Sequence, residues 1–408
     1  MRPSSLSLFL IPSLALAAVV AIAPKSGPAP VGPYSPGVFA GDYLYVSGQG
    51  AKNAAGVVPS TFDAQVRQTL DNVKAIVEAA GLTMDNVVYT QVYLTDVSKF
   101  EEMNAIFRSY FPRTPPARAT LGVSKLPGTP VEINAVAIRN AADKKVVTVP
   151  GYQSSEPISA GVLTSDRLFV SGMRGRSLTD GKVPAGPAEQ VNLALDGMQA
   201  VVKAAGLQMA NMVFINPYLT NKIPTPMMNK LYAERFEFGN TPARATIEVA
   251  SLPQEAQIEF TGVAVRDISE RRAVRPKNMP PSPTASPCVF AGDTFYCSAK
   301  SGFIPGPNGG IFAGTMDQQL RQTMRNLLDN LEEAGLDFSD VVSSNVYLDD
   351  LNEFQAMNKI YALYFKGIAP ARTTIQHVHP VNRLANADAI FPSLEQISII
   401  AVKNGAKN

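Results

Sequence analysis

Four residue types recur together three times along the chain, and together they could bind and hydrolyse a small acid. The three sets are Arg118, Ser47, Asn104 and Glu132; Arg244, Ser171, Asn229 and Glu259; and Arg372, Ser298, Asn358 and Glu395. Arginine offers a planar fork that binds a carboxylate bidentately, and a glutamate can position or deprotonate a water. This pattern predicts a small anionic substrate that is attacked by water. The alternative is structural: the arginine and the glutamate pair as a salt bridge and the asparagine caps a turn.

Histidine and cysteine cannot belong to a site that is repeated three times. The chain has two residues of each type, and all four lie in its last third. Nucleophilic catalysis by Cys-His or Ser-His-Asp is therefore excluded as a shared feature. His377 and His379 face the same way on an expected strand, but they lack an evident third ligand, so we predict no metal site.

The repeated arginines lie in similar segments, PPARATLGV, TPARATIEV and APARTTIQH. Their spacing of roughly 127 residues is too long for a solenoid repeat and close to the size of one ordinary domain. We therefore predict three domains, over residues 24–140, 150–266 and 281–403. The net charge is only +2, which argues against a nucleic-acid partner.

Each domain shows the same expected order of elements. Residues 38–48, 162–172 and 289–299 each contain two β-prone runs around a Gly-Asp or Ser-Asp pair, which indicates a hairpin. An apolar stripe over residues 66–80 predicts a helix that ends at Gly81, and the other copies repeat it before Gly206 and Gly335. A strand, a second helix and two strands follow. The order β-β-α-β-α-β-β predicts an α+β fold in which two helices cover one face of a sheet.

The first 23 residues have the composition of a secretory signal peptide. They contain one arginine, an apolar stretch from Leu6 and small residues at Ala15 and Ala17, where we expect cleavage. Cleavage after Ala23 would also fit the small-residue rule, and an uncleaved anchor is the alternative. The signal predicts a periplasmic or secreted protein without stable membrane association after cleavage.

Longer stretches resemble one known family. The segments VGPYSPGVFAGDYLYVSGQ, DNVKAIVEAAGL, PARATLGVSKLP and VEINAVAI resemble the Rid family of enamine/imine deaminases, also called the YjgF or L-PSP family. The resemblance covers nearly all of residues 28–403 as three copies. It implies a chorismate-mutase-like fold that assembles as a trimer with three clefts between neighbours. One chain would supply all three units here, as a monomer that is an intramolecular pseudo-trimer.

The resemblance also implies roles for the repeated residues. The arginines would clamp a substrate carboxylate and the glutamates would hold the hydrolytic water, while the serines, the asparagines and Tyr34 would contact the substrate. The implied substrate is a 2-imino or enamine acid, such as 2-iminobutanoate or 2-aminoacrylate, which is converted to a 2-oxo acid and ammonia. No metal or organic cofactor is implied. Alternatives are a non-catalytic acid-binding protein, a chaperone-like binder and a ribonuclease.

The three copies are not equally complete. Gly32-Pro33-Tyr34 occurs only in the first copy, and Ile158 and Ala285 align with Tyr34. The first copy is therefore expected to be the most intact.

The two cysteines lie on either side of the third hairpin. If the chain turns at Gly292-Asp293, Cys288 faces Cys297 at a non-hydrogen-bonded pair, where the Cα atoms are about 4.5 Å apart. That separation permits a disulfide, and export would supply the oxidising environment. The alternative is two reduced cysteines on one face of the sheet.

Overall fold

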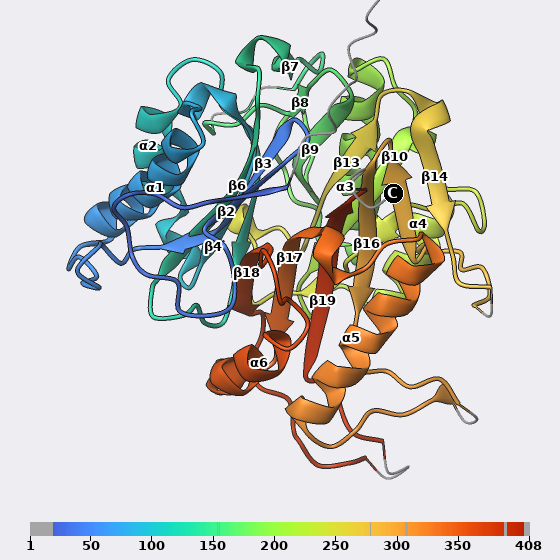
Figure 1. The fold of residues 1–408 in the computed structure, drawn as a ribbon. Coiled ribbons are helices and arrows are strands. Elements are labelled where there is room, and N and C mark those ends of the chain that lie inside the picture. Colours follow the sequence, from blue (N-terminus) through green and yellow to red (C-terminus); the bar gives the residue numbers. More distant parts are fainter. Residues whose placement is uncertain are drawn as a thin grey trace, which may run out of the picture.

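A computed structural model describes residues 19–152, 154, 156–277, 279–306, 309–386 and 390–403. Three β-sheets lie at the centre of the molecule, and each sheet is covered on its outer face by one long helix and one shorter helix (Figure 1). This is the α+β architecture of three tandem domains that the sequence predicts.

The elements of the three domains follow one order. The first domain contains β1 (Val20–Ile22), β2 (Gly37–Ala40), β3 (Tyr43–Gly50), α1 (Phe62–Ala79), β4 (Val87–Leu94), α2 (Phe100–Tyr110), β5 (Ala117–Gly122) and β6 (Val131–Ile138). The second contains β7 (Lys145–Val147), β8 (Gly161–Leu163), β9 (Arg167–Arg174), α3 (Pro187–Ala204), β10 (Met212–Leu219), α4 (Thr225–Ala233), β11 (Ala243–Arg244), β12 (Ile247–Glu248) and β13 (Ile258–Val265). The third contains β14 (Arg271–Val274), β15 (Cys288–Ala291), β16 (Thr294–Lys300), α5 (Met316–Glu333), β17 (Val341–Leu348), α6 (Phe354–Tyr361), β18 (Ala371–Gln376) and β19 (Glu395–Val402).

The strand order within the sheets is also shared. The first sheet runs β1-β2-β3-β6-β4-β5, and the other two sheets repeat that order. The strand that carries the arginine pairs in parallel with the strand before the second helix, for example β5 with β4. All other pairs in the first sheet are antiparallel. The arginine strand therefore lies at one edge of each sheet, where it can meet the next domain.

Short strands lie before the residues at which the sequence analysis placed the domain starts. Each sheet has an additional short edge strand, and these strands are β1, β7 and β14. Val20–Ile22, at the end of the predicted signal segment 1–23, pairs with β2 as part of the first sheet, and the cleavage site stays a prediction. Cleavage after Ala17 would retain this strand. Residues 1–18 lie outside the described part of the chain, and among the described helices none is long and apolar enough to cross a membrane.

The helices begin and end where their sequence dictates. The Thr61 side chain accepts a hydrogen bond from the Ala64 N–H at the start of α1. Gly81 follows the helix at φ 76°, a left-handed conformation that suits glycine. Val66 and Leu70 belong to the buried stripe of α1, which packs on the first sheet.

The three domains share a core on the central axis of the molecule. Tyr93, Tyr218 and Tyr347 occupy equivalent positions on β4, β10 and β17, and all three are buried in one cluster. Further mixed clusters join the first domain to both neighbours and the second domain to the third. The sheets therefore close into an intramolecular pseudo-trimer, as the family resemblance implies.

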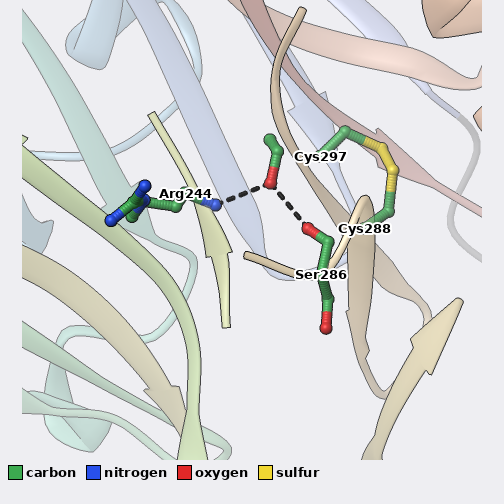
Figure 2. Close-up of a disulfide and its surroundings, with 5 residues drawn as sticks. Arg244, Ser286, Cys288 and Cys297 are labelled. Carbon is green, nitrogen blue, oxygen red and sulfur yellow. Dashed lines mark hydrogen bonds between the residues drawn. A yellow bond between two sulfur atoms is a disulfide. The ribbon is translucent and has the colours of Figure 1, made fainter. Parts of the chain in front are cut away.

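The third hairpin has the register expected from its turn. Ala291 faces Thr294 next to Gly292-Asp293, and Cys288 faces Cys297 at the far end. The two Cα atoms are 4.1 Å apart and the sulfur atoms are bonded (Figure 2). The disulfide thus ties β15 to β16, the strand that leads to Ser298.

Candidate active site

The repeated serines lie at the three seams between domains. The Ser47 hydroxyl accepts a hydrogen bond from the Arg372 backbone N–H at 2.8 Å and donates one to the Ser35 carbonyl at 2.6 Å. Ser171 forms the same pair of bonds with Arg118 and Ser159, and Ser298 with Arg244 and Ser286 (Figure 2). The sequence analysis expected these serines to contact substrate. Their hydroxyls position the arginine strand of the neighbouring domain, and contact with a substrate stays a prediction.

These seams determine which domains form each cleft. Arg372 of the third domain faces the first domain, Arg118 of the first faces the second, and Arg244 of the second faces the third. We call the three sites the 3–1 cleft, the 1–2 cleft and the 2–3 cleft. The intact first copy therefore completes the site at Arg372, and not the site at Arg118.

Each arginine is oriented by the asparagine of its own domain. The distances from guanidinium nitrogen to Asn Oδ1 are 2.6 Å for Arg118–Asn104, 2.8 Å for Arg244–Asn229 and 2.7 Å for Arg372–Asn358. The asparagine lies on the second helix of each domain and accepts one N–H of the fork. The structure thus brings the predicted arginine and asparagine together in all three clefts.

The 3–1 cleft is an open pocket that contains a clamp and a carboxylate. Its lining includes Arg372 and Thr374 from β18 and Tyr34, Gln49 and Glu132 from the first domain. The Arg372 guanidinium lies 5.2 Å from the centre of the Tyr34 ring. The Thr374 hydroxyl is buried and has no hydrogen-bond partner among the described residues, so it is available to a ligand.

Two glycines allow the close approaches in this cleft. A Cβ atom at Gly32 would lie 2.5 Å from Arg372 Nη2, and a Cβ atom at Gly48 would lie 2.0 Å from Glu132 Oε1. No side chain fits at either position without moving the arginine or the glutamate. The segment Gly32-Pro33-Tyr34 therefore leaves the arginine fork open to the pocket.

Burial shifts the pKa of both ionisable groups in the 3–1 cleft. Desolvation raises the pKa of Glu132 to about 8, although the positive charge of Arg372 opposes this shift. Desolvation also lowers the pKa of Arg372. Glu132 can therefore hold or release a proton near neutral pH, as general acid-base catalysis requires.

The 1–2 cleft is occupied by a side chain of the protein itself. Glu156 occupies the position that Gly32 has in the first copy. Glu156 lies three residues before Ser159, whose carbonyl accepts the seam hydrogen bond, as Gly32 lies three residues before Ser35. Its carboxylate lies 3.5 Å from Arg118 Nη2, and both side chains are almost completely buried. The position that would take a substrate carboxylate already holds one.

A second substitution completes this buried network. Arg174 pairs with Glu259 across the strands, where the first copy has Gly50 opposite Glu132. The Arg174 guanidinium bonds to Glu156 and lies 3.9 Å from Glu259 Oε2. Burial raises the pKa of Glu259 to about 7. Two arginines and two glutamates thus form one buried network inside the 1–2 cleft.

The predicted glutamate of the third copy is wrong by one residue. Glu132 and Glu259 face Tyr93 and Tyr218 in their sheets, whereas Tyr347 faces Gln396. Glu395 is one residue earlier, so strand alternation turns it to the opposite face, where it accepts a hydrogen bond from Thr323 of α5. Burial there raises the pKa of Glu395 to about 8. Glu395 is therefore not part of a cleft.

The described residues that line the 2–3 cleft include cations and no carboxylate. Arg244, Lys300 and Gln396 line the pocket, with Ala285 at the position of Tyr34. The sequence analysis did not identify Lys300, Glu156 or Arg174 as residues of a cleft. The described residues contain no group of three or more histidine, cysteine, aspartate or glutamate side chains that could hold a metal ion.

Comparison with known proteins defines the class of this fold. The family model described as Endoribonuclease L-PSP matches residues 24–139, 152–266 and 278–387. The chain therefore belongs to the Rid (YjgF, L-PSP) family, as three tandem copies.

Individual relatives each match the length of one domain. The 2-iminobutanoate/2-iminopropanoate deaminase of Escherichia coli (strain K12) is 44% identical over 123 residues, which is 29% of this chain and 96% of the relative. A RutC family protein of Aquifex aeolicus is 44% identical over 120 residues, 28% of this chain and 95% of the relative. The crystal structure of the YjgF gene product from E. coli is 43% identical and covers 30% of this chain and 99% of its own, with a TM-score of 0.29.

Proposed function

We propose that the chain hydrolyses small 2-imino or enamine acids to 2-oxo acids and ammonia, and that it does so in the 3–1 cleft. The observation that carries this proposal is the open pocket that joins Arg372 to Glu132. The proposed reaction is the kind that the name of the E. coli relative states, 2-iminobutanoate/2-iminopropanoate deaminase. Freshly formed imines of this kind are small carboxylic acids, which suits a single arginine clamp.

The proposed mechanism assigns one task to each group. The Arg372 fork binds the substrate carboxylate in two hydrogen bonds and so orients the C=N bond in the pocket. The Glu132 carboxylate accepts a proton from a water as the water oxygen bonds to the imine carbon. Glu132 passes that proton to the imine nitrogen, which completes a neutral carbinolamine. Glu132 then accepts the proton of the new hydroxyl group and passes it to the amino nitrogen, so that the C–N bond breaks, ammonia leaves and the C=O bond of the 2-oxo acid forms.

The other two clefts lack parts of this arrangement. In the 1–2 cleft the Arg118 fork is paired with Glu156, and in the 2–3 cleft Gln396 replaces the glutamate. An amide cannot accept the proton from the attacking water. The chain is therefore proposed to have one hydrolytic site among three related clefts.

The test is ammonia release from 2-iminobutanoate that is generated in the assay. The wild-type chain should accelerate formation of 2-oxobutanoate and ammonia well above the spontaneous rate. The variant with all three arginines, Arg118, Arg244 and Arg372, changed to alanine should not. Equal rates for the wild type and this variant, with both proteins folded, would reject the enzymatic function and favour a binding protein.

A further inference from the structure

The 2–3 cleft has a second cation, Lys300, and Gln396 in place of the glutamate, and the proposed hydrolysis uses neither residue. We propose that it is a binding site for a small organic dicarboxylate, with one carboxylate on Arg244 and the other on Lys300. This inference concerns a different cleft from the proposed active site and does not depend on the deaminase activity.

The lining of this cleft favours anions. Two cationic side chains, Arg244 and Lys300, face one pocket. The other polar side chains that line it, among the residues that the structure describes, are neutral: Thr246, Ser282, Ser286, Ser298 and Gln396. In the 3–1 cleft Glu132 supplies a carboxylate opposite the arginine, but Gln396 takes that place here. A second anionic group on the ligand would meet repulsion in the 3–1 cleft and attraction in the 2–3 cleft.

The arginine of this cleft has donors to spare. Asn229 accepts one N–H of Arg244 at 2.8 Å, and within the described part of the chain no carboxylate lies within ion-pair distance of Arg244. Desolvation lowers the pKa of Arg244. A ligand carboxylate would occupy the remaining face of the fork and would offset the cost of burying this charge.

Lys300 is a second cation without a partner. It stands at the position of Gln49, and the described residues offer it neither a hydrogen bond nor an ion pair. Burial alone lowers its pKa. Lys300 also lines an adjacent depression that includes Asp329, Glu332 and Glu333 of α5, but among the described residues none of these carboxylates lies within ion-pair distance of the lysine, and Arg325 pairs with Asp329 at 2.7 Å. An anion in the cleft would compensate the lysine charge.

The floor of the cleft is held in place by covalent and hydrogen bonds. The Cys288–Cys297 disulfide ties β15 to β16 directly before Ser298, whose hydroxyl joins the Arg244 N–H to the Ser286 carbonyl (Figure 2). Lys300 follows two residues later on β16. This bracing fixes the strand that carries Lys300 against the strand that carries Arg244, as a two-point ligand requires.

Calorimetric titration of the full chain tests the site. An Arg372→Ala variant removes the clamp of the 3–1 cleft, and malonate, succinate and glutarate then probe the spacing between the two cations, with butanoate as the monoanion. We expect at least one dicarboxylate to bind once per chain and more tightly than butanoate. Changing Lys300→Gln, the residue type of the first copy, should weaken that binding at least roughly 10-fold. Lys300→Arg should retain it.

The controls distinguish the charge of Lys300 from the loss of any one positive charge in the domain, and a dicarboxylate ligand from inorganic phosphate. The exposed Lys359→Gln variant removes one positive charge from the same domain and should bind as before. The proposal is overturned if no dicarboxylate binds better than butanoate, or if Lys300→Gln binds as the parent does. Inorganic phosphate is titrated in parallel, and tighter binding of phosphate than of all three dicarboxylates would overturn the dicarboxylate assignment.

Discussion

The 3–1 and 1–2 clefts contain the same arginine, asparagine, serine and glutamate, yet they are different sites. In the 3–1 cleft Gly32 leaves the Arg372 fork open, whereas in the 1–2 cleft the Glu156 carboxylate lies on Arg118. The repeated residues are therefore necessary but not sufficient. The residues that surround the clamp decide whether it can receive a substrate.

A tandem chain makes this divergence possible. In a symmetric homotrimer one substitution appears in all three clefts at once. Here Glu156 and Arg174 change one cleft, and Lys300 and Gln396 change another, while the third keeps its open pocket. The repeated serine hydrogen bonds at the seams hold all three arginine strands in place, whichever residues line the clefts.

The largest expected difference between clefts is at the glutamate. Glu132→Gln should lower kcat/KM for 2-iminobutanoate by about 100-fold or more, because an amide cannot act as the base. Glu395→Gln is the matched control and should remain within about twofold of the wild type, because Glu395 faces α5. Equal losses in the two variants would contradict the register-based assignment.

The rate should also depend on pH in a defined direction. Glu132 has a pKa of about 8 and must be ionised to accept a proton, so kcat/KM should rise as pH increases from 6 and level off above about 8. The spontaneous hydrolysis of the same imine serves as the reference, since the substrate also titrates. A profile that is flat or falls over this range would argue against Glu132 as the base.

The occupied 1–2 cleft should be convertible to an active one. In an Arg372→Ala parent, the changes Glu156→Gly, Ile158→Tyr and Arg174→Gly give the second domain the residues of the first. Ammonia release should rise at least roughly 10-fold over the parent, because Arg118 and Glu259 become accessible to substrate. A folded protein without any gain would show that Glu156 is not what closes this cleft.

The effect of the disulfide is smaller. Replacing Cys288 and Cys297 by serine should lower the free energy of unfolding by about 2 to 3 kcal/mol, because the closed loop is short. Denaturant unfolding measures the loss. Thiol titration of the denatured, unreduced wild type should find no free thiols, and two free thiols would refute the bridge.

The sequence predicted the repeated elements well because their signals are strong. The stripe at Val66 and Leu70, the stop at Gly81 and the hairpin register around Gly292 all follow from local chemistry. The edge strands β1, β7 and β14 were missed because three or four residues carry no clear alternation. They are stable only because a neighbouring strand is present.

The errors in the site have a different origin. Glu395 and Gln396 are adjacent and polar, and a longer preceding segment hides their alignment, although Ile397 matches Ile133 and could have revealed the shift. The order in which domains complete the clefts depends on how the ring closes, which no local pattern encodes. Glu156 was overlooked because its partner, Arg118, belongs to another domain.

The central claim is that the 3–1 cleft alone hydrolyses the imine, and one set of rates tests it directly. Ammonia release from 2-iminobutanoate is compared for the wild type, Arg372→Ala and the double variant Arg118→Ala with Arg244→Ala. Loss of the Arg372 fork should reduce the rate by about 100-fold, since two charge-assisted hydrogen bonds disappear. The double variant should keep most of the wild-type rate. Retained activity in Arg372→Ala together with its loss in the double variant would contradict the account.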